Sequence, residues 1–203
     1  MRSNQNIFVI AGEASGDANG AFLVNDVLKI NPNILFFGIG GAKLKEKNVN
    51  LIHEYSTINY IGFSNVIKNI RKIKSVLNNT VEFVKKLNPE IIILIDFPGF
   101  NLKFAELVRK FYKGKIIYYI SPQIWAWHKN RIEKIKKFID RMLVIFPFEV
   151  EFYRKLNYNV DYVGHPQTKI IEKFLNENKR DESDIFRICL LPGSRIEEIQ
   201  RIF

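Results

Sequence analysis

Asp96 is the residue whose neighbours best suit it to act as a base. It follows five aliphatic residues, 91–95, which lack polar alternation and so predict a strand buried on both faces of a parallel sheet. Ligands of such sheets bind at the carboxyl ends of strands, where a carboxylate can accept a proton from a substrate hydroxyl. The alternative is that Asp96 only accepts backbone N–H bonds in the turn. After Pro98 and Gly99, Asn101 is expected to cap a helix that starts at residue 102.

Two glycine-rich segments follow the first two predicted strands. Residues 12–17 follow a strand at 6–11, and residues 38–41 follow a strand at 34–37. A glycine loop between a strand and a helix turns helix-terminal N–H groups toward an anion or a sugar. The three glycines of the second segment indicate positive φ angles or a close backbone approach, to a ligand or to the neighbouring strand. Neither segment has the G-x-G-x-x-G spacing, which disfavours a dehydrogenase.

Both tryptophans of the chain lie in one loop. Trp125 and Trp127 belong to the stretch SPQIWAWH at 121–128, after a predicted strand at 115–120. Tryptophan offers flat apolar area to sugars and acyl chains, so the loop is expected to line a pocket or an interface.

Residues 59–74 predict a basic amphipathic helix, because apolar residues recur at helical spacing with Lys and Arg between them. Such a helix can lie on an anionic membrane surface. The commoner alternative is that its apolar face packs on the core and its basic back faces solvent. The candidates for membrane contact are Ile61, Phe63, Val66, Ile67, Lys68 and Arg71.

The composition limits the partners. The 203 residues include 31 Lys and Arg against 21 Asp and Glu, and the net charge of +10 favours acidic lipid surfaces or phosphorylated substrates. No motif that reads nucleic acid accompanies the charge, so nucleic acid is not expected as a partner. The three histidines and one cysteine show no metal-ligand spacing, and no metal is expected.

The composition also indicates a compartment. The single cysteine, Cys189, favours a reducing environment, and its apolar neighbours predict a buried strand residue. The apolar run that ends at Ala11 is too short for a signal peptide or a membrane span. A cytosolic protein is therefore expected.

The order of predicted elements amounts to about six β-α units, which indicates an α/β protein with a Rossmann-like parallel sheet and helices on both faces. Residues 1–175 are expected to form this domain. The polar stretch 176–185 reads as a linker, and residues 186–203 read as the first β-α unit of a second domain.

Seven motifs then occur in a fixed order: AGEASGD at 11–17, GIGG at 38–41, DFPGFN at 96–101, SPQIWAW at 121–127, FPFE at 146–149, VGHP at 163–166 and LLPGSR at 190–195. The series resembles the lipid-A-disaccharide synthase family, colinearly from residue 6 to the end. The resemblance implies a two-domain GT-B type fold. Residues 1–175 would be its acceptor-side domain, and residues 186–203 would begin its nucleotide-sugar-binding domain.

The resemblance also implies an activity. A hexosyltransferase of this family joins UDP-2,3-diacylglucosamine to 2,3-diacylglucosamine 1-phosphate, yielding the lipid A disaccharide 1-phosphate and UDP without a cofactor. It works as a peripheral protein on the cytoplasmic face of the inner membrane. Asp96 takes the role of general base. The implied substrate-binding residues are Glu13, Ser15, Gly16, Asp17, Gly40, Gly41, Asn101, Ser121, Trp125, Trp127 and Arg195.

Several alternatives stay open at this point. Family members are appreciably longer, so the 203-residue chain alone is expected to transfer sugar poorly or not at all, and its partner could be a complementing carboxyl-terminal half or a second copy. Other functions are a different GT-B enzyme acting on a UDP-sugar, such as an epimerase, or a non-catalytic module that binds lipid or membrane. Glu13 competes with Asp96 for the role of base.

Overall fold

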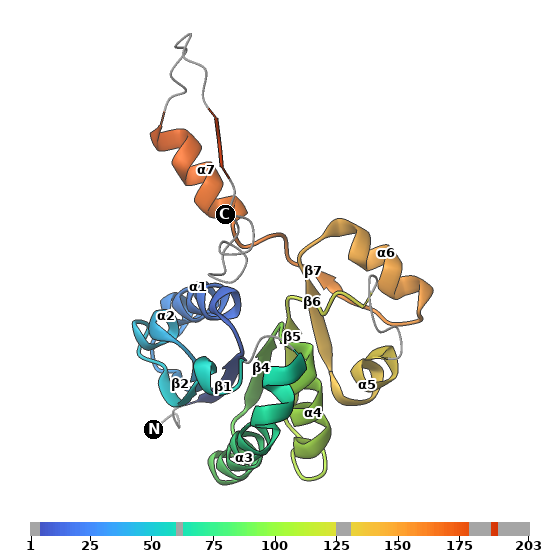
Figure 1. Ribbon diagram of the computed structural model, residues 1–203. Helices are drawn as coiled ribbons and strands as arrows, with labels where there is room; N and C mark the ends of the chain where they lie inside the picture. Colours follow the sequence, from blue (N-terminus) through green and yellow to red (C-terminus); the bar gives the residue numbers. More distant parts are fainter. Residues whose placement is uncertain (1–4, 60–62, 125–130, 179–187, 191–203) are drawn as a thin grey trace. The chain divides into compact units, whose positions relative to one another are not determined.

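A computed structural model describes residues 5–59, 63–124, 131–178 and 188–190, and of residues 63–68 it describes the backbone alone. The first of two compact units, Met1–Thr168, holds a seven-stranded sheet in the order β3-β2-β1-β4-β5-β6-β7 (Figure 1). Every neighbouring pair is parallel. The α/β fold class expected from the sequence is confirmed.

The strands are short, and the central strand β4 lies between β1 and β5. Ala11 pairs with Ile95, and Ile95 pairs with Tyr119, so these three strands end side by side. Their bounds are β1 (Asn6–Ala11), β2 (Leu35–Gly40), β3 (Asn50–Glu54), β4 (Ile91–Ile95), β5 (Lys115–Tyr119), β6 (Arg141–Val144) and β7 (Asp161–Tyr162).

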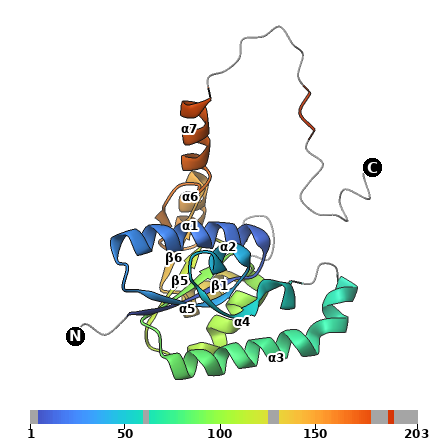
Figure 2. The ribbon, with the colours of Figure 1, turned by 90° about the vertical axis from the view of Figure 1, so that its left-hand side faces the viewer.

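Helices cover both faces of the sheet. Figures 1 and 2 show α1 and α2 on one side and α3 and α4 on the other, with α3 running along the length of the sheet. The helices are α1 (Ala14–Ile30), α2 (Ala42–Lys45), α3 (Phe63–Leu87), α4 (Pro98–Val108), α5 (Arg131–Phe138), α6 (Pro147–Lys155) and α7 (Thr168–Glu177), and a 3₁₀ turn spans Tyr55–Thr57.

The aliphatic run of β4 joins the two halves of the core. Ile92 and Leu94 belong to the cluster under α3 and α4, whereas Ile93 and Ile95 belong to the cluster under α1. Residues 92–95 are all buried, as the absence of polar alternation predicted. Because β4 is packed on both faces, the sheet fixes the position of its carboxyl end, where Asp96 follows.

The second strand extends further than the sequence indicated. It spans Leu35–Gly40 in place of residues 34–37, so Gly38 and Gly40 lie within a strand and not in a loop. A Cβ added at Gly38 would lie 1.8 Å from the carbonyl oxygen of Val9 in β1. Among the described residues Gly164 is the sole glycine with a positive φ, so the neighbouring strand is what requires glycine at position 38.

Helix α4 begins at Pro98, four residues earlier than expected. Phe97 is its N-cap residue, and Pro98 occupies the first turn, where a missing N–H is tolerated. Asn101 lies inside the helix, so the expectation that it caps the helix was wrong. Its side chain bonds the backbone of the preceding turn instead.

The second compact unit, Lys169–Phe203, is described in two pieces. Helix α7 carries exposed Ile170, Ile171, Phe174 and Leu175, and residues 188–190 have no regular secondary structure. Cys189 is exposed, which contradicts the buried strand position expected for it. The remainder of the expected linker and β-α unit lies outside the described residues, and the domain boundaries stay a prediction.

Candidate active site

Polar residues gather where β1, β4 and β5 end. Because these strands are parallel and in register, the loop after Ala11, the turn at Asp96 and the segment after Tyr119 share one edge of the sheet. Glu13, Asp96 and Ser121 are the predicted site residues that these three loops carry. This edge is where open α/β sheets bind their ligands.

The backbone of Asp96 adopts an uncommon conformation. Asp96 and Phe97 have φ values of 43° and 47°, both in the left-handed region, although neither is glycine. Such residues cost about 1–3 kcal/mol each and persist where the surroundings fix them. Here the Asp96 N–H donates to the Tyr119 carbonyl oxygen over 3.2 Å, and the Asp96 carbonyl oxygen accepts from Asn101 and Tyr118. The turn is therefore held from both sides.

The carboxyl group of Asp96 has a pKa raised from 3.8 to about 6. Burial is the main cause, the negative charge of Glu13 adds to it, and a hydrogen bond from the Phe97 backbone opposes both. A carboxylate whose main task is to accept backbone N–H bonds would have a lowered pKa. The raised pKa therefore favours the base interpretation of Asp96 over the turn interpretation.

Glu13 lies at the start of α1, close enough to Asp96 for its charge to raise the Asp96 pKa. It is the N-cap residue of the helix, yet its side chain makes no capping hydrogen bond. Its Oε1 accepts a hydrogen bond from the Ser15 hydroxyl over 2.5 Å, and both side chains are at least partly exposed. A Cβ added at Gly16 would lie 3.5 Å from the Ala11 Cβ, an ordinary contact distance. Glu13 and Ser15 thus present polar atoms at the site.

Asp17 is buried, and its carboxylate is occupied by backbone donors. It accepts hydrogen bonds from the N–H groups of Gly41 (2.7 Å), Lys43 (3.1 Å) and Leu44 (3.1 Å). These are donors of the first turn of α2, which has no cap of its own. The structure thus gives Asp17 a role in positioning α2, and its direct contact with substrate stays a prediction.

Gly40 and Gly41 are required by the packing of the protein itself. A Cβ at Gly40 would lie 2.4 Å from the Leu44 side chain, and one at Gly41 would lie 2.4 Å from the Tyr55 ring. The close approach that the glycines indicated is therefore made by neighbouring side chains. Substrate contact at these two positions would involve backbone atoms and remains a prediction.

Ser121 joins the end of β5 to the start of α6. Its hydroxyl donates to Oε1 of Glu149, and both side chains are buried. Oε2 of Glu149 accepts from the N–H groups of Ile145 (3.2 Å) and Phe146 (3.0 Å). Glu149 therefore fixes the loop that holds Ser121. The sequence alone indicates no role for Glu149, although it belongs to the FPFE motif.

Some of the predicted residues lie outside the described part of the chain. They are Trp125, Trp127, Arg195 and Ile61, together with the side chains of Phe63, Val66, Ile67 and Lys68. Of the membrane candidates only Arg71 has a described side chain, and this side chain is exposed. Further along α3, beyond the stretch 59–74, Val76 and Leu77 are buried in the core, whereas Ile70 within the stretch is 58% exposed. Membrane contact by this stretch therefore stays a prediction.

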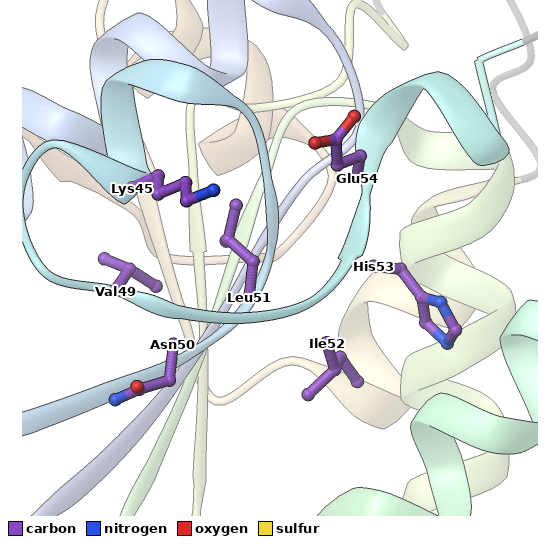
Figure 3. A pocket seen from close by; sticks show the side chains of 7 residues that line it. All are labelled: Lys45, Val49, Asn50, Leu51, Ile52, His53 and Glu54. Carbon is purple, nitrogen blue, oxygen red and sulfur yellow. The ribbon is translucent and has the colours of Figure 1, made fainter.

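A hollow of about 410 Å³ lies elsewhere, along the edge strand β3 (Figure 3). Figure 3 shows Leu51 and Ile52 pointing to opposite sides of the strand, so the lining side chains do not converge on one point. The strand order separates this hollow from β4 by β2 and β1. It therefore does not include the Asp96 site.

No helix among the described residues is long and apolar enough to cross a bilayer. Within the same residues, no group of three or more His, Cys, Asp or Glu side chains could hold a metal ion.

The sequence matches one family over nearly its whole length. A family profile described as "Lipid-A-disaccharide synthetase" matches residues 7–203. The lipid-A-disaccharide synthase of Syntrophus aciditrophicus is 39% identical over 205 residues, which cover 97% of this chain and 52% of that protein. The enzyme of the same name from Coxiella burnetii is 37% identical over 206 residues, which cover 98% and 54%.

A solved structure supports the fold alone. The crystal structure of a UDP-N-acetylglucosamine 2-epimerase matches with a TM-score of 0.61 and 12% identity, covering 90% of this chain and 53% of that one. The chain spans about half the length of the curated relatives that it matches. Since the family profile covers almost the whole chain and the relatives share one name, the chain belongs to the lipid-A-disaccharide synthetase family.

Proposed function

We propose that this chain is the acceptor-side half of a glycosyltransferase that joins UDP-2,3-diacylglucosamine to 2,3-diacylglucosamine 1-phosphate and releases UDP. The observation that carries the proposal is Asp96, a carboxylate with a pKa of about 6 at the carboxyl end of the central strand. Membership of the family supplies the reaction, and the residue supplies the chemistry at the point where the sheet edge would meet the acceptor.

Asp96 is the proposed general base. Transfer requires that the acceptor hydroxyl lose its proton as it attacks the donor sugar, and a base works best when its pKa lies near the working pH. With a pKa of about 6, Asp96 is mostly ionised at neutral pH and is still basic enough to accept the proton.

Glu13 is assigned a supporting role in preference to that of base. Its carboxylate is hydrogen-bonded to Ser15 and partly exposed, whereas Asp96 is held by a fixed turn. The negative charge of Glu13 raises the pKa of Asp96 and so strengthens Asp96 as a base. Glu13 and Ser15 offer hydrogen-bond partners to the acceptor. The other residues proposed to contact substrates are Gly16, Asp17, Gly40, Gly41, Ser121, Trp125, Trp127 and Arg195. The Asn101 side chain is fully buried, so a role in positioning the Asp96 turn replaces the substrate contact expected for it.

The partners follow from the substrates. Acyl chains keep the donor and acceptor in a membrane, so we propose that the protein works as a peripheral protein on the cytoplasmic face of the inner membrane. The net charge of +10 and the exposed Arg71 of α3 support attraction to anionic headgroups and to the acceptor phosphate. Residues Ile61, Phe63, Val66, Ile67 and Lys68 remain the proposed apolar and basic contacts with the membrane.

We also propose that transfer needs a further half, because the chain spans about half of its relatives. The described site holds a base, Asp96, and a loop proposed to bind the acceptor, which carries Glu13 and Ser15. These residues do not by themselves account for binding of the UDP group. The chain alone is therefore expected to transfer little or no sugar. The proposed partner is a complementing carboxyl-terminal half that binds the UDP group, and a second copy of this chain is the alternative partner.

A substrate panel tests the proposal. The chain would be assayed alone and joined to the carboxyl-terminal half of the Syntrophus aciditrophicus relative, with acylated and with non-acylated UDP-glucosamine donors and with UDP-N-acetylglucosamine as an epimerase substrate. The proposal predicts that only the joined protein forms disaccharide, and only from the acylated donor and the acylated acceptor. Epimerisation, or transfer to non-acylated sugars at a similar rate, would contradict it, and liposome binding without any turnover would favour a non-catalytic module.

A further inference from the structure

The carbonyl oxygen of Asp96 accepts hydrogen bonds from two side chains that come from different elements. Nδ2 of Asn101, in α4, donates over 2.7 Å, and the Tyr118 hydroxyl, in β5, donates over 2.5 Å. Both donor side chains are fully buried, with exposed fractions of 0%. Asn101 Nδ2 also lies 3.2 Å from the carbonyl oxygen of Ile95. Two rigid side chains therefore fix one peptide plane.

This peptide plane lies in a strained part of the backbone. Asp96 and Phe97 are left-handed, and Ile120, at the end of the neighbouring strand, has a φ of 63°. A β-branched residue rarely adopts this conformation. Main-chain bonds from Asp96 to Tyr119 and from Ile120 to Leu143 (3.0 Å) hold the N–H sides of these turns. On the carbonyl side of Asp96, the restraint comes from Asn101 and Tyr118.

We propose that Tyr118 and Asn101 are positioning residues for the transfer reaction, which clamp the Asp96 carbonyl so that the Asp96 carboxylate stays at the acceptor hydroxyl. The reaction itself rests on the proposed function, but the clamp does not. Tyr118 faces the interior under Asp96 and has no route to the substrate, because its side chain is buried. It acts through the turn.

The groups that face Asp96 determine how loss of the clamp would change the pKa of its carboxyl group. Glu13, at the start of α1, contributes a negative charge, and the Phe97 backbone at the start of α4 contributes a hydrogen bond. From β5, Tyr118 is electrostatically coupled to Asp96, and Arg131 of α5 acts on Tyr118. When the clamp is removed, we expect the turn to relax toward solvent and away from Glu13. Both changes favour the charged carboxylate, so the Asp96 pKa falls.

Tyr112 provides a matched control. Its hydroxyl also donates to a backbone carbonyl, that of Pro89, over 2.9 Å, and its exposed fraction is 2%. Pro89 precedes β4, so this bond lies at the opposite end of the strand from Asp96. Tyr112→Phe therefore removes the same kind of bond from the same kind of site without touching the clamp.

The experiment is a carbon-13 NMR titration of the aspartate carboxyl groups in the 203-residue chain, with Asp96→Asn used to assign the signal of Asp96. We expect Tyr118→Phe to lower the Asp96 midpoint from about 6 by about one pH unit or more, toward 3.8. Asn101→Ala should lower it in the same direction, and Tyr112→Phe should leave it unchanged. The clamp is refuted when Tyr118→Phe and Tyr112→Phe titrate alike in folded protein.

Kinetics of the joined protein add a readout that a purely structural role would not move. Tyr118→Phe should lower kcat about tenfold with little change in KM, because the base is misplaced and the substrate contacts are kept. Tyr112→Phe should keep both values. A lack of turnover in the unsubstituted joined protein would contradict the proposed function alone, and the NMR titration would still decide the clamp.

Discussion

The ring of Phe97 occupies the space into which any side chain at position 12 would extend. A Cβ built on Gly12 would lie 2.1 Å from Cδ1 of Phe97. Gly12 directly follows β1, and Phe97 follows Asp96 at the end of β4. This contact therefore packs the loop that carries Glu13 against the turn that carries the base. Glycine is required at position 12 for close approach.

Gly12→Ala should therefore disturb both stability and the site. Displacing the Phe97 ring is expected to destabilise the fold by about 1–3 kcal/mol, as overpacking generally does. The measurement is chemical denaturation, with Gly99→Ala as the control. A Cβ at Gly99 would meet no atom within 4 Å, so this variant should be neutral or slightly more stable. Equal stability of the two variants would show that Phe97 moves aside at no cost.

Asp17→Ala should cost stability even though Asp17 lies in a candidate binding loop. The change leaves the N–H groups of Gly41, Lys43 and Leu44 without their acceptor, which is expected to cost about 1–3 kcal/mol. Asp26, on the same helix, pairs with Lys29 at the surface, so Asp26→Ala should change the unfolding free energy by less than about 0.5 kcal/mol. If Asp17→Ala lost substrate binding but kept full stability, the positioning role would be wrong.

Asp96→Asn should stabilise the protein at neutral pH while it removes the base. Between pH 3.8 and about 6 the folded protein holds more protons at Asp96 than the unfolded chain, so the free energy of unfolding falls as pH rises. The cost is fully present above pH 6, and removing it should add up to about 3 kcal/mol. Denaturation of both proteins at about pH 4 and about pH 7.5 should show a gain only at the higher pH. A gain that is the same at both pH values would contradict this account.

The rate of transfer should depend on pH through the same group. Because the ionised form of Asp96 is the base, kcat/KM of the joined protein should fall as pH falls through about 6 and should be level above it. Glu13→Gln should move the midpoint to lower pH, because the charge of Glu13 helps to raise the pKa of Asp96. If the midpoint of the pH profile does not change in this variant, the charge of Glu13 does not affect the pKa of the base.

The central part of the fold could be predicted from sequence because its signals are local. The run at 91–95 is the strand that it predicts, and residues 92–95 are all buried. The place of Asp96 at a strand end followed directly. The edge strand β3 was not predicted, because residues 50–54 mix polar and apolar types and most of them are only partly buried.

The details of the site depended on contacts between distant residues. The need for glycine at position 38 comes from the carbonyl oxygen of Val9, and the role of Asp17 comes from donors 24 to 27 residues away. Tyr118 was missed because a tyrosine in a buried strand resembles any core residue. Its one available signal is that a buried hydroxyl needs a partner, and only the fold shows that the partner is Asp96.

The most direct test of the account is sugar transfer by the joined protein with Asp96→Asn, beside Glu13→Gln, in saturating acylated donor and acceptor. The account predicts that Asp96→Asn lowers kcat by about 10²-fold or more, as loss of a general base does, while Glu13→Gln keeps a larger part of the rate. Thermal unfolding of both variants would show that they are folded. The account would be contradicted if Asp96→Asn kept most of the transfer rate of the unsubstituted protein while Glu13→Gln was inactive. Glu13 would then be the base.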